Sequence, residues 1–379
     1  MIERELEQLL GLVTIVAGAG LAGVLEVQKN DQKERDRERK VYAASFGRQV
    51  AATELLAWIR GLSSIPRPAR GGHDSVAVEV VGSADGIRHL VRLPGPTASG
   101  LIRAMQAAIP ALRLEPAAVL AYRPSGVREL IATHRYRPLR ADRPEEVAAA
   151  ILAALSSLGP DELVVWQWVI SPARGSGQVH AADVAAAAGW LALVRQLWGM
   201  EPGKPDVFHT RAARAKSDEP LFIAAGRVGA RARTAARTNE LLSRVIRATG
   251  GLRAPGVWLT GHDAGPGGAA RLETAATPVR SIPALLNARE VVAVLGVPIA
   301  GPMVPGVSYN GGRLLPPSSR VADRGRIIGD AIASGAERPV ALSVRASLEH
   351  MIALAPTGGG KTTLLASLIL QDISGGAAS

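Results

Sequence analysis

The sequence predicts an α+β domain that follows one transmembrane helix and precedes the start of an α/β domain. Residues 9–25 are apolar and uncharged, residues 73–298 alternate between strand-like and helix-like patterns, and residues 351–373 follow the order strand, glycine-rich loop, helix. These three observations divide the chain into a membrane anchor helix (1–28), a connecting helix with a linker (29–72), the α+β domain (73–298) and an incomplete second domain (299–379).

Composition narrows the classes of function. The 44 Lys and Arg residues exceed the 33 Asp and Glu residues, which gives a formal net charge of +11. A basic balance favours acidic partners such as nucleic acid or an anionic membrane face. The chain has no Cys, which excludes disulfides and thiolate metal sites, and its seven His residues lack ligand spacing. Aromatic residues make up only 3% of the chain, which argues against base stacking as a main mode of binding.

The anchor is predicted from the run Leu9 to Leu25, whose 17 residues carry no charge. A helix of this length spans about 25 Å, enough for a bilayer core with some local thinning. Acids mostly precede the run, and Lys and Arg follow it, so the positive-inside bias predicts a single-pass protein of the cell membrane with its bulk in the cytoplasm. A buried helix is the alternative. Residues 29–40 alternate acids and bases, and we expect them to continue as a solvated helix towards Trp58.

The middle of the chain predicts an α+β domain, in which the order of elements is compatible with two ferredoxin-like halves. A strand hairpin is expected at 75–93, and the run Leu163 to Ile170 is the clearest strand. Trp166 and Trp168 point to one face of that strand, where core packing is the simpler interpretation. The remaining expected strands are 112–122, 128–136 and 220–227, and the expected helices are 98–108, the stretch after Asp142, 184–197 and 230–248.

Two patterns in this domain leave a functional alternative open. Four Arg residues lie on one side of the helix predicted at 230–248 and form either a DNA-facing stripe or a solvated face. The stretch Gly261-His262-Asp263 either takes part in acid–base chemistry or is a glycine-rich loop. The four Arg residues of the stripe are Arg233, Arg237, Arg244 and Arg247.

The strongest motif is Ala355-x-x-x-x-Gly360-Lys361-Thr362, a P-loop pattern with Ala at the first position. Its glycines let backbone N–H groups point at a polyphosphate, and the helix that follows adds its positive dipole end. We expect Lys361 to act at the β- and γ-phosphates of ATP as the catalytic cation and Thr362 to ligate Mg²⁺. The residues expected to bind the nucleotide are Thr357, Gly358, Gly359, Gly360, Lys361, Thr362 and Thr363.

The order of anchor, α+β domain and P-loop resembles the TraG/TraD-like coupling ATPases of type IV secretion and conjugative transfer, in the larger HerA/FtsK-type group. The residues that carry the resemblance are Arg338 to Val344, Leu348 to His350, and Met351 to Leu365. The resemblance implies a RecA-like ATPase domain, of which 299–379 are the start, and a hexameric ring of identical subunits. It also implies as partners DNA or a DNA–protein complex, the inner membrane and secretion-channel components.

Two hypotheses follow. The first is a membrane-anchored, ATP-binding DNA-translocation ATPase of which this chain is the N-terminal portion, unable to hydrolyse ATP alone because further strands are needed. The second is a membrane-tethered assembly or binding module of a secretion system with a P-loop that does not hydrolyse ATP. A P-loop ATPase that powers assembly or protein export is a third, weaker reading.

Overall fold

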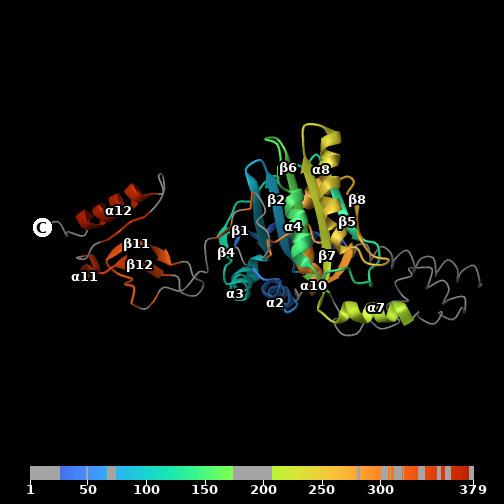
Figure 1. Ribbon diagram of the computed structural model, residues 1–379, viewed down its shortest axis with the longest axis horizontal. Helices are drawn as coiled ribbons and strands as arrows, with labels where there is room; N and C mark the ends of the chain where they lie inside the picture. Colours follow the sequence, from blue (N-terminus) through green and yellow to red (C-terminus); the bar gives the residue numbers. More distant parts are fainter. Residues whose placement is uncertain are drawn as a thin grey trace, which may run out of the picture. The chain divides into compact units, whose positions relative to one another are not determined.

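The computed structural model divides the chain into two compact units, residues 1–311 and residues 312–379 (Figure 1). It describes residues 26–47, 50–65, 74–173, 207–279, 282–299, 306–307, 309–310, 318, 320–331, 338–347, 351–354 and 360–374. The division falls after residue 311, whereas the sequence places the second domain from residue 299. Each unit is described separately below.

Unit 1 is an α+β fold built on one large, mostly antiparallel sheet. Its strand order is β10-β1-β3-β2-β6-β7-β5-β8, with β4 paired to β1 and β9 paired to β7, and only the β1–β10 pairing is parallel. The strands are β1 (Lys40–Gly47), β2 (Val76–Ser83), β3 (Gly86–Leu93), β4 (Arg113–Pro116), β5 (Gly126–Ala132), β6 (Leu163–Pro172), β7 (Leu221–Arg231), β8 (Leu259–Asp263), β9 (Ala284–Asn287) and β10 (Tyr309–Asn310).

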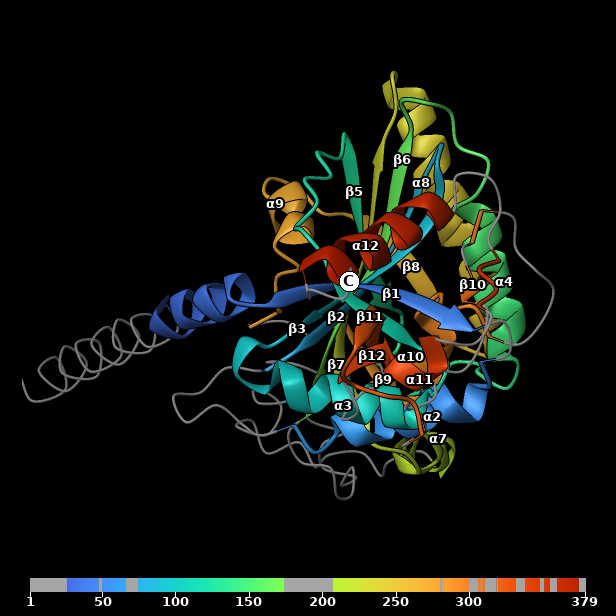
Figure 2. The ribbon, with the colours of Figure 1, turned by 90° about the vertical axis from the view of Figure 1, so that its left-hand side faces the viewer.

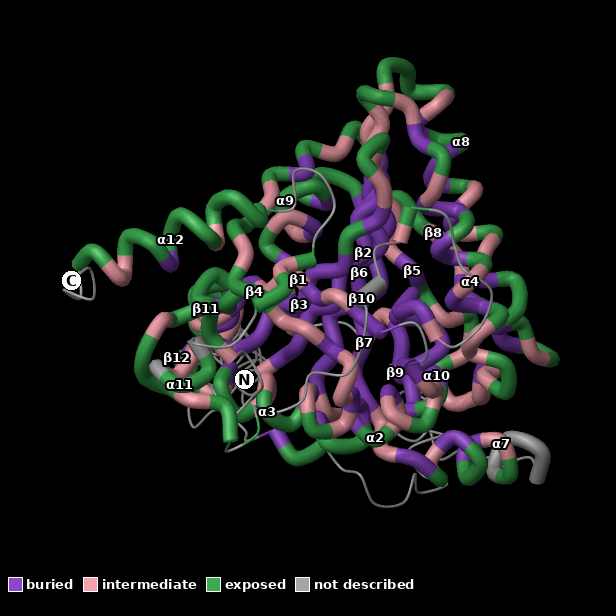
Figure 3. The backbone as a smooth tube through the Cα atoms, turned by 60° about the vertical axis from the view of Figure 1, so that its left-hand side comes forward, coloured by how far each residue is buried: buried purple, intermediate pink, exposed green. Residues whose placement is uncertain are grey.

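Helices pack on both faces of this sheet. One face carries the main hydrophobic core, which α2, α3, α4, α8 and α10 cover, and the other face carries a smaller core beneath α9. The central strands are buried, as Figure 3 shows for β2, β6 and β7. The helices of unit 1 are α2 (Ala52–Leu62), α3 (Ala98–Ala108), α4 (Pro144–Ala154), α7 (Val207–Ser217), α8 (Ala235–Ala248), α9 (Gly268–Glu273) and α10 (Ala288–Val294), with short 3₁₀ turns η1 (Gly95–Thr97) and η2 (Thr249–Leu252).

The pairing of β6 with β7 shows how the sequence forms the centre of the sheet. Trp166 and Trp168 lie on the core face of β6, and both are fully buried with their rings 5.9 Å apart. Gly226 of β7 lies directly opposite Trp168, and a Cβ at this position would come within 2.7 Å of the indole ring. Glycine is therefore required there because the large ring occupies the space of a side chain. The core interpretation of the tryptophan pair is confirmed.

The first described helix, 26–37, does not continue towards Trp58 as expected, because strand β1 follows it. Figure 2 shows this helix running outward from the start of β1. Its acids and bases do not form only a solvated face, since Gln32, Asp36 and the adjacent Arg39 are buried. The alternating charges predict a continuing helix and give no indication of β1. The partners that bury Asp36 and Arg39 lie far along the chain, so the local sequence does not reveal them.

The predicted membrane anchor requires correction. None of the described helices is long and apolar enough to span a bilayer. The fold class with one transmembrane helix and the single-pass localisation in the cell membrane are therefore not supported. The segment from Leu9 to Leu25, on which both were based, lies outside the described residues, as does the helix expected at 184–197.

Unit 2 contains an antiparallel pair of strands, β11 (Arg326–Ala331) and β12 (Arg338–Leu342), and the helices α11 (Val344–Ser347) and α12 (Lys361–Ser374). The strand expected at Met351 to Leu354 is not paired, and Ile352 and Leu354 are 81% and 90% exposed. A strand needs a neighbour to accept its backbone hydrogen bonds. Among the described residues of unit 2, β11 and β12 pair with each other and Ala322 forms a single bridge to Ala341 of β12, so neither pairing involves Met351 to Leu354. The start of a parallel α/β sheet is therefore not formed there.

Candidate nucleotide site and a buried polar network

Gly360 closes the predicted P-loop with a backbone conformation that suits glycine. Its φ is +79°, and apart from its chain neighbours no atom of the described residues lies within 4 Å of the place where a Cβ would stand. The carbonyl of Gly360 accepts the first hydrogen bond of α12 from the Leu364 N–H at 2.9 Å. Gly360 is thus the residue at which the loop turns into the helix, and its surroundings leave room for a ligand to approach the backbone.

Lys361, Thr362 and Thr363 occupy the first turn of α12, and all three are exposed. The first turn contains no acidic residue that would neutralise the positive end of the helix dipole. The structure therefore brings these three side chains together with Gly360 at one helix N-terminus. Thr357, Gly358 and Gly359, the other expected ligands of the nucleotide, lie outside the described residues.

The opposite end of α12 is held against the hairpin of unit 2. The Gln371 amide accepts from the Ile327 N–H at 2.7 Å and donates to the Ile327 carbonyl at 2.9 Å. Arg326 of β11 forms an ion pair with Asp372 at 2.6 Å. These contacts attach the C-terminal half of α12 to β11. The first turn of α12 takes no part in these particular contacts with β11.

A second polar feature, in unit 1, was not predicted from the sequence. Glu79, Gln167, Arg227 and Glu129 are direct cross-strand partners on β2, β6, β7 and β5. They form a polar row across four adjacent strands, on the sheet face opposite the tryptophan pair. The signal in the sequence is a single polar residue inside each of three apolar strands, as in VAVEVV, LVVWQWVI and FIAAGRVGA. Such a residue is buried and requires partners.

The centre of this row is the carboxylate of Glu79, which is fully buried. It forms an ion pair with Arg92 at 2.9 Å, accepts from the Tyr122 hydroxyl at 2.5 Å and accepts from the Gln167 amide at 2.7 Å. Burial, followed by the nearby negative charge of Glu79, raises the pKa of the Tyr122 hydroxyl far above its ordinary value. Tyr122 therefore remains a neutral donor to the carboxylate.

Four long side chains from the sheet side bind one backbone segment, residues 272–277, which we call the strap. Its carbonyls lie at and beyond the C-terminal end of α9, where helix carbonyls lack partners and cations are favoured. Burial lowers the pKa of the Arg227 guanidinium to about 10, which leaves it charged at neutral pH. The donors to the strap are Gln167 (to Leu272 O, 2.7 Å), Arg92 (to Glu273 O, 2.8 Å), Arg39 (to Ala275 O, 2.6 Å) and Arg227 (to Ala276 O, 2.6 Å).

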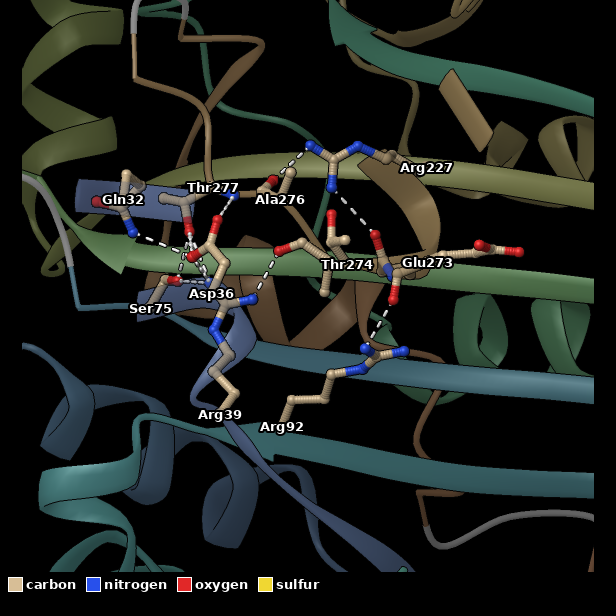
Figure 4. A network of polar contacts seen from close by, with 12 residues as sticks. Gln32, Asp36, Arg39, Ser75, Arg92, Arg227, Glu273, Thr274, Ala276 and Thr277 are labelled. Carbon is tan, nitrogen blue, oxygen red and sulfur yellow. Dashed lines mark hydrogen bonds and ion pairs between the residues drawn. The ribbon is translucent and has the colours of Figure 1, made fainter. Parts of the chain in front are cut away.

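The base of helix 26–37 joins the same network, as Figure 4 shows. Asp36 accepts from the Thr277 N–H at 2.8 Å and forms an ion pair with Arg39 at 2.5 Å. Arg39 also donates to the Ser75 and Thr277 hydroxyls. Gln32, one helical turn before Asp36, donates to the same carboxylate at 3.0 Å. The network thus connects the helix, the start of β2 and the strap through buried groups that bond to one another.

The structure also shows where the two patterns with open alternatives lie, namely the basic stripe and the stretch Gly261-His262-Asp263. Arg237 of α8 forms ion pairs with Glu162 and Glu240, and Arg233, which lies just before α8, pairs with Asp161. This favours the structural interpretation for these two Arg residues, because their charges are already compensated, whereas Arg244 donates to the Ser156 carbonyl and the function of Arg247 stays a prediction. His262 and Asp263 lie on the edge strand β8 instead of a loop. The His262 ring bonds to the Thr260 hydroxyl at 2.9 Å, and Asp263 pairs with Arg128.

Comparison with known proteins gives no further assignment: no protein-family model matches the chain, and no curated protein matches it in sequence.

Proposed function

We propose that residues 357–363 bind the phosphates of ATP together with Mg²⁺. The observation that carries the proposal is the N-terminus of α12, where Gly360 has a positive φ and is followed by exposed Lys361 and Thr362. A 14-residue helix with no acid in its first turn offers N–H donors and a positive dipole end to a polyphosphate. Lys361 contributes a compact positive charge for the β- and γ-phosphates, and the Thr362 hydroxyl contributes an oxygen ligand for Mg²⁺.

In this proposal the chain works in DNA translocation by an ATPase of the type IV secretion or conjugative coupling class. Its support is the resemblance of 338–365 and the net charge of +11, which suits a nucleic-acid partner. Lys361 would stabilise charge on the transferred phosphoryl group. Hydrolysis also needs an acidic Mg²⁺ ligand and neighbouring strands, so ATP binding is the step assigned to the residues described here.

The test is a titration of the full chain with a fluorescent ATP analogue, with and without Mg²⁺. We expect Lys361→Ala to weaken binding about 10- to 100-fold, because charge-assisted hydrogen bonds are lost at a phosphate. Arg345→Ala is the matched control, since it removes an exposed positive charge from α11 of the same unit. Thr362→Ala should remove the Mg²⁺-dependent part of the affinity. Equal binding by wild type, Lys361→Ala and Arg345→Ala would contradict the proposal.

A second candidate function is an assembly or binding module of a secretion system, whose P-loop does not hydrolyse ATP. The observation in its favour is the unequal packing of the two units. Unit 1 has an extensive core of its own, whereas Ala341 and Leu368 are the only buried hydrophobic residues among the described part of unit 2. Nucleotide-independent capture of secretion-channel components, with no nucleotide-stimulated binding of duplex DNA in a salt titration, would favour this candidate over the motor.

A further inference from the structure

Strand β8 forms one edge of the large sheet of unit 1. It pairs with β5 in antiparallel fashion and with no other described strand, and the two strands lie next to each other at the right-hand side of the sheet in Figure 1. A strand at the edge of a sheet presents a row of backbone N–H and C=O groups that the sheet itself does not use. Such a row can bind one more strand from another molecule.

The hydrogen bonds at the two ends of β8 show which backbone groups face outward. The Thr133 N–H donates to the Trp258 carbonyl at 3.0 Å, and the Ala264 N–H donates to the Val127 carbonyl at 3.2 Å. In an antiparallel pair, residues that bond to the partner strand alternate with residues that do not. Since positions 258 and 264 bond towards β5, every second residue between them points its backbone groups away from β5. These outward-facing residues are Leu259, Gly261 and Asp263.

The surroundings of the first residues of β8 are basic. Residues 133–141 follow β5 and residues 247–262 lead into β8, and the two segments contain five Arg, two His and no Asp or Glu. Arg140 pairs with Asp142 at 3.3 Å. In contrast, Arg135 and Arg253 are exposed and form no ion pair with the described residues. The surface therefore has an excess of positive charge, which favours an acidic partner.

An aromatic and an aliphatic side chain lie on the same surface. Trp258 is 37% exposed, and the Arg253 guanidinium lies over its ring, 4.9 Å from the centroid. Ile131 of β5 is 36% exposed and is the cross-strand partner of Thr260, so it shares a face of the sheet with Trp258. The ring holds the guanidinium in place next to the free edge. A strand with both acidic and apolar side chains is complementary to this combination.

We propose that the outer edge of β8 binds an acidic, extended segment of another protein as an additional strand. The backbone of the segment bonds to the three outward-facing residues, its acidic side chains pair with Arg135 and Arg253, and its apolar side chains lie on Trp258 and Ile131. A nucleic acid matches the charge but has no backbone that can extend a sheet. A second copy of this chain would bring like charges together.

Only the acidic segment therefore matches both the edge and its charge. The inference goes beyond nucleotide binding and does not depend on the P-loop, which lies in the other unit.

The test titrates the full chain with a fluorescent peptide of about ten residues in which Glu and Val alternate. We expect saturable binding that weakens with salt, and slower amide hydrogen exchange in residues 258–264. The same peptide with its Val residues N-methylated keeps the charge but loses the strand hydrogen bonds, and it should bind at least about tenfold more weakly. A peptide with Lys in place of Glu should not bind, because it repels the basic surface.

Variants of the chain separate the charge from the backbone contribution. We expect Arg135→Ala/Arg253→Ala to weaken peptide binding about three- to tenfold, as for two exposed ion pairs. Arg88→Ala removes an exposed Arg from β3 and is the matched control. Asp263→Pro removes one outward N–H that β5 does not use, so it should bind about fivefold more weakly than Asp263→Ala, which loses the same carboxylate.

The proposal is overturned if the N-methylated peptide binds as well as the unmodified one. It is also overturned if the Arg135→Ala/Arg253→Ala variant binds the peptide as Arg88→Ala does, or if single-stranded oligothymidylate binds at this surface and the acidic peptide does not. The peptide comparison uses the unaltered chain, so the test holds even where Asp263→Pro impairs folding.

Discussion

Replacing Glu79 with Leu tests the buried polar row most directly. The carboxylate of Glu79 is fully buried and has three partners, of which Arg92 at 2.9 Å is the only cation. Gln167 keeps a second acceptor at the Leu272 carbonyl, whereas the Arg92 guanidinium loses its counterion in an almost fully buried position. Removing one member of a buried ion pair costs about 3–5 kcal/mol. We therefore expect Glu79→Leu to lower the free energy of unfolding of unit 1 by about 4 kcal/mol.

The assay is urea unfolding followed by tryptophan fluorescence. All six tryptophans lie between residues 58 and 258, so the signal reports on unit 1. The control is Glu146→Ala, which breaks an exposed ion pair with Arg143 and should change stability by at most about 0.5 kcal/mol. The double variant Glu79→Leu/Arg92→Met should regain at least about 1 kcal/mol over Glu79→Leu, because it removes the unpaired charge. The reasoning is refuted if Glu79→Leu costs no more than Glu146→Ala, or if Arg92→Met brings no recovery.

Two further predictions concern pH and packing in unit 1. Burial lowers the pKa of His89 to about 4, and its Nε2–H bonds to the Gly296 carbonyl. Because the pKa of His89 is lower in the folded state, the unfolded chain binds the proton at a higher pH than the folded chain. The free energy of unfolding is therefore at its full value above about pH 6.5 and decreases by about 3 kcal/mol towards pH 4. Urea titrations of wild type and His89→Gln should diverge between these pH values, and parallel profiles would contradict the assignment. Gly226→Ala should lower the melting temperature, because its Cβ would lie 2.7 Å from a tryptophan ring and overpacking costs about 1–3 kcal/mol. Gly61→Ala, which has no atom within 4 Å of the new Cβ and lies in a helix, should be neutral or stabilising; an equal effect of both substitutions would show that the close contact is not the cause.

Several elements could be predicted because their patterns are local. The hairpin of β2 and β3, helix α3 and strand β6 all lie within a few residues of the expected ranges. Their periodicity and flanking turns are contained in about ten residues each, so no distant partner is needed to recognise them. The P-loop motif is local for the same reason, and its last residues, Gly360 to Thr363, lie at the start of a helix as expected.

The strand expected at Met351 to Leu354 shows the limit of local patterns. Four apolar residues indicate a strand, but a strand also requires neighbours for its backbone groups, and the described part of unit 2 does not pair with it. The same limit applies to β1, whose sequence follows a run of alternating charges that indicates a helix. Its pairing with β3 and β4 depends on residues about 50 to 70 positions away.

The sequence by itself determined the α+β character of residues 73–298, the tryptophan-rich central strand and the glycine-lysine-threonine turn. Only the tertiary structure decided which charges are buried. Asp36 and Arg39 look like a solvated ion pair in the sequence, but their partners Thr277 and Ala275 are more than 230 residues away. A charge is stable in the interior only when such partners surround it. That information is distributed along the whole chain and is absent from any short stretch of it.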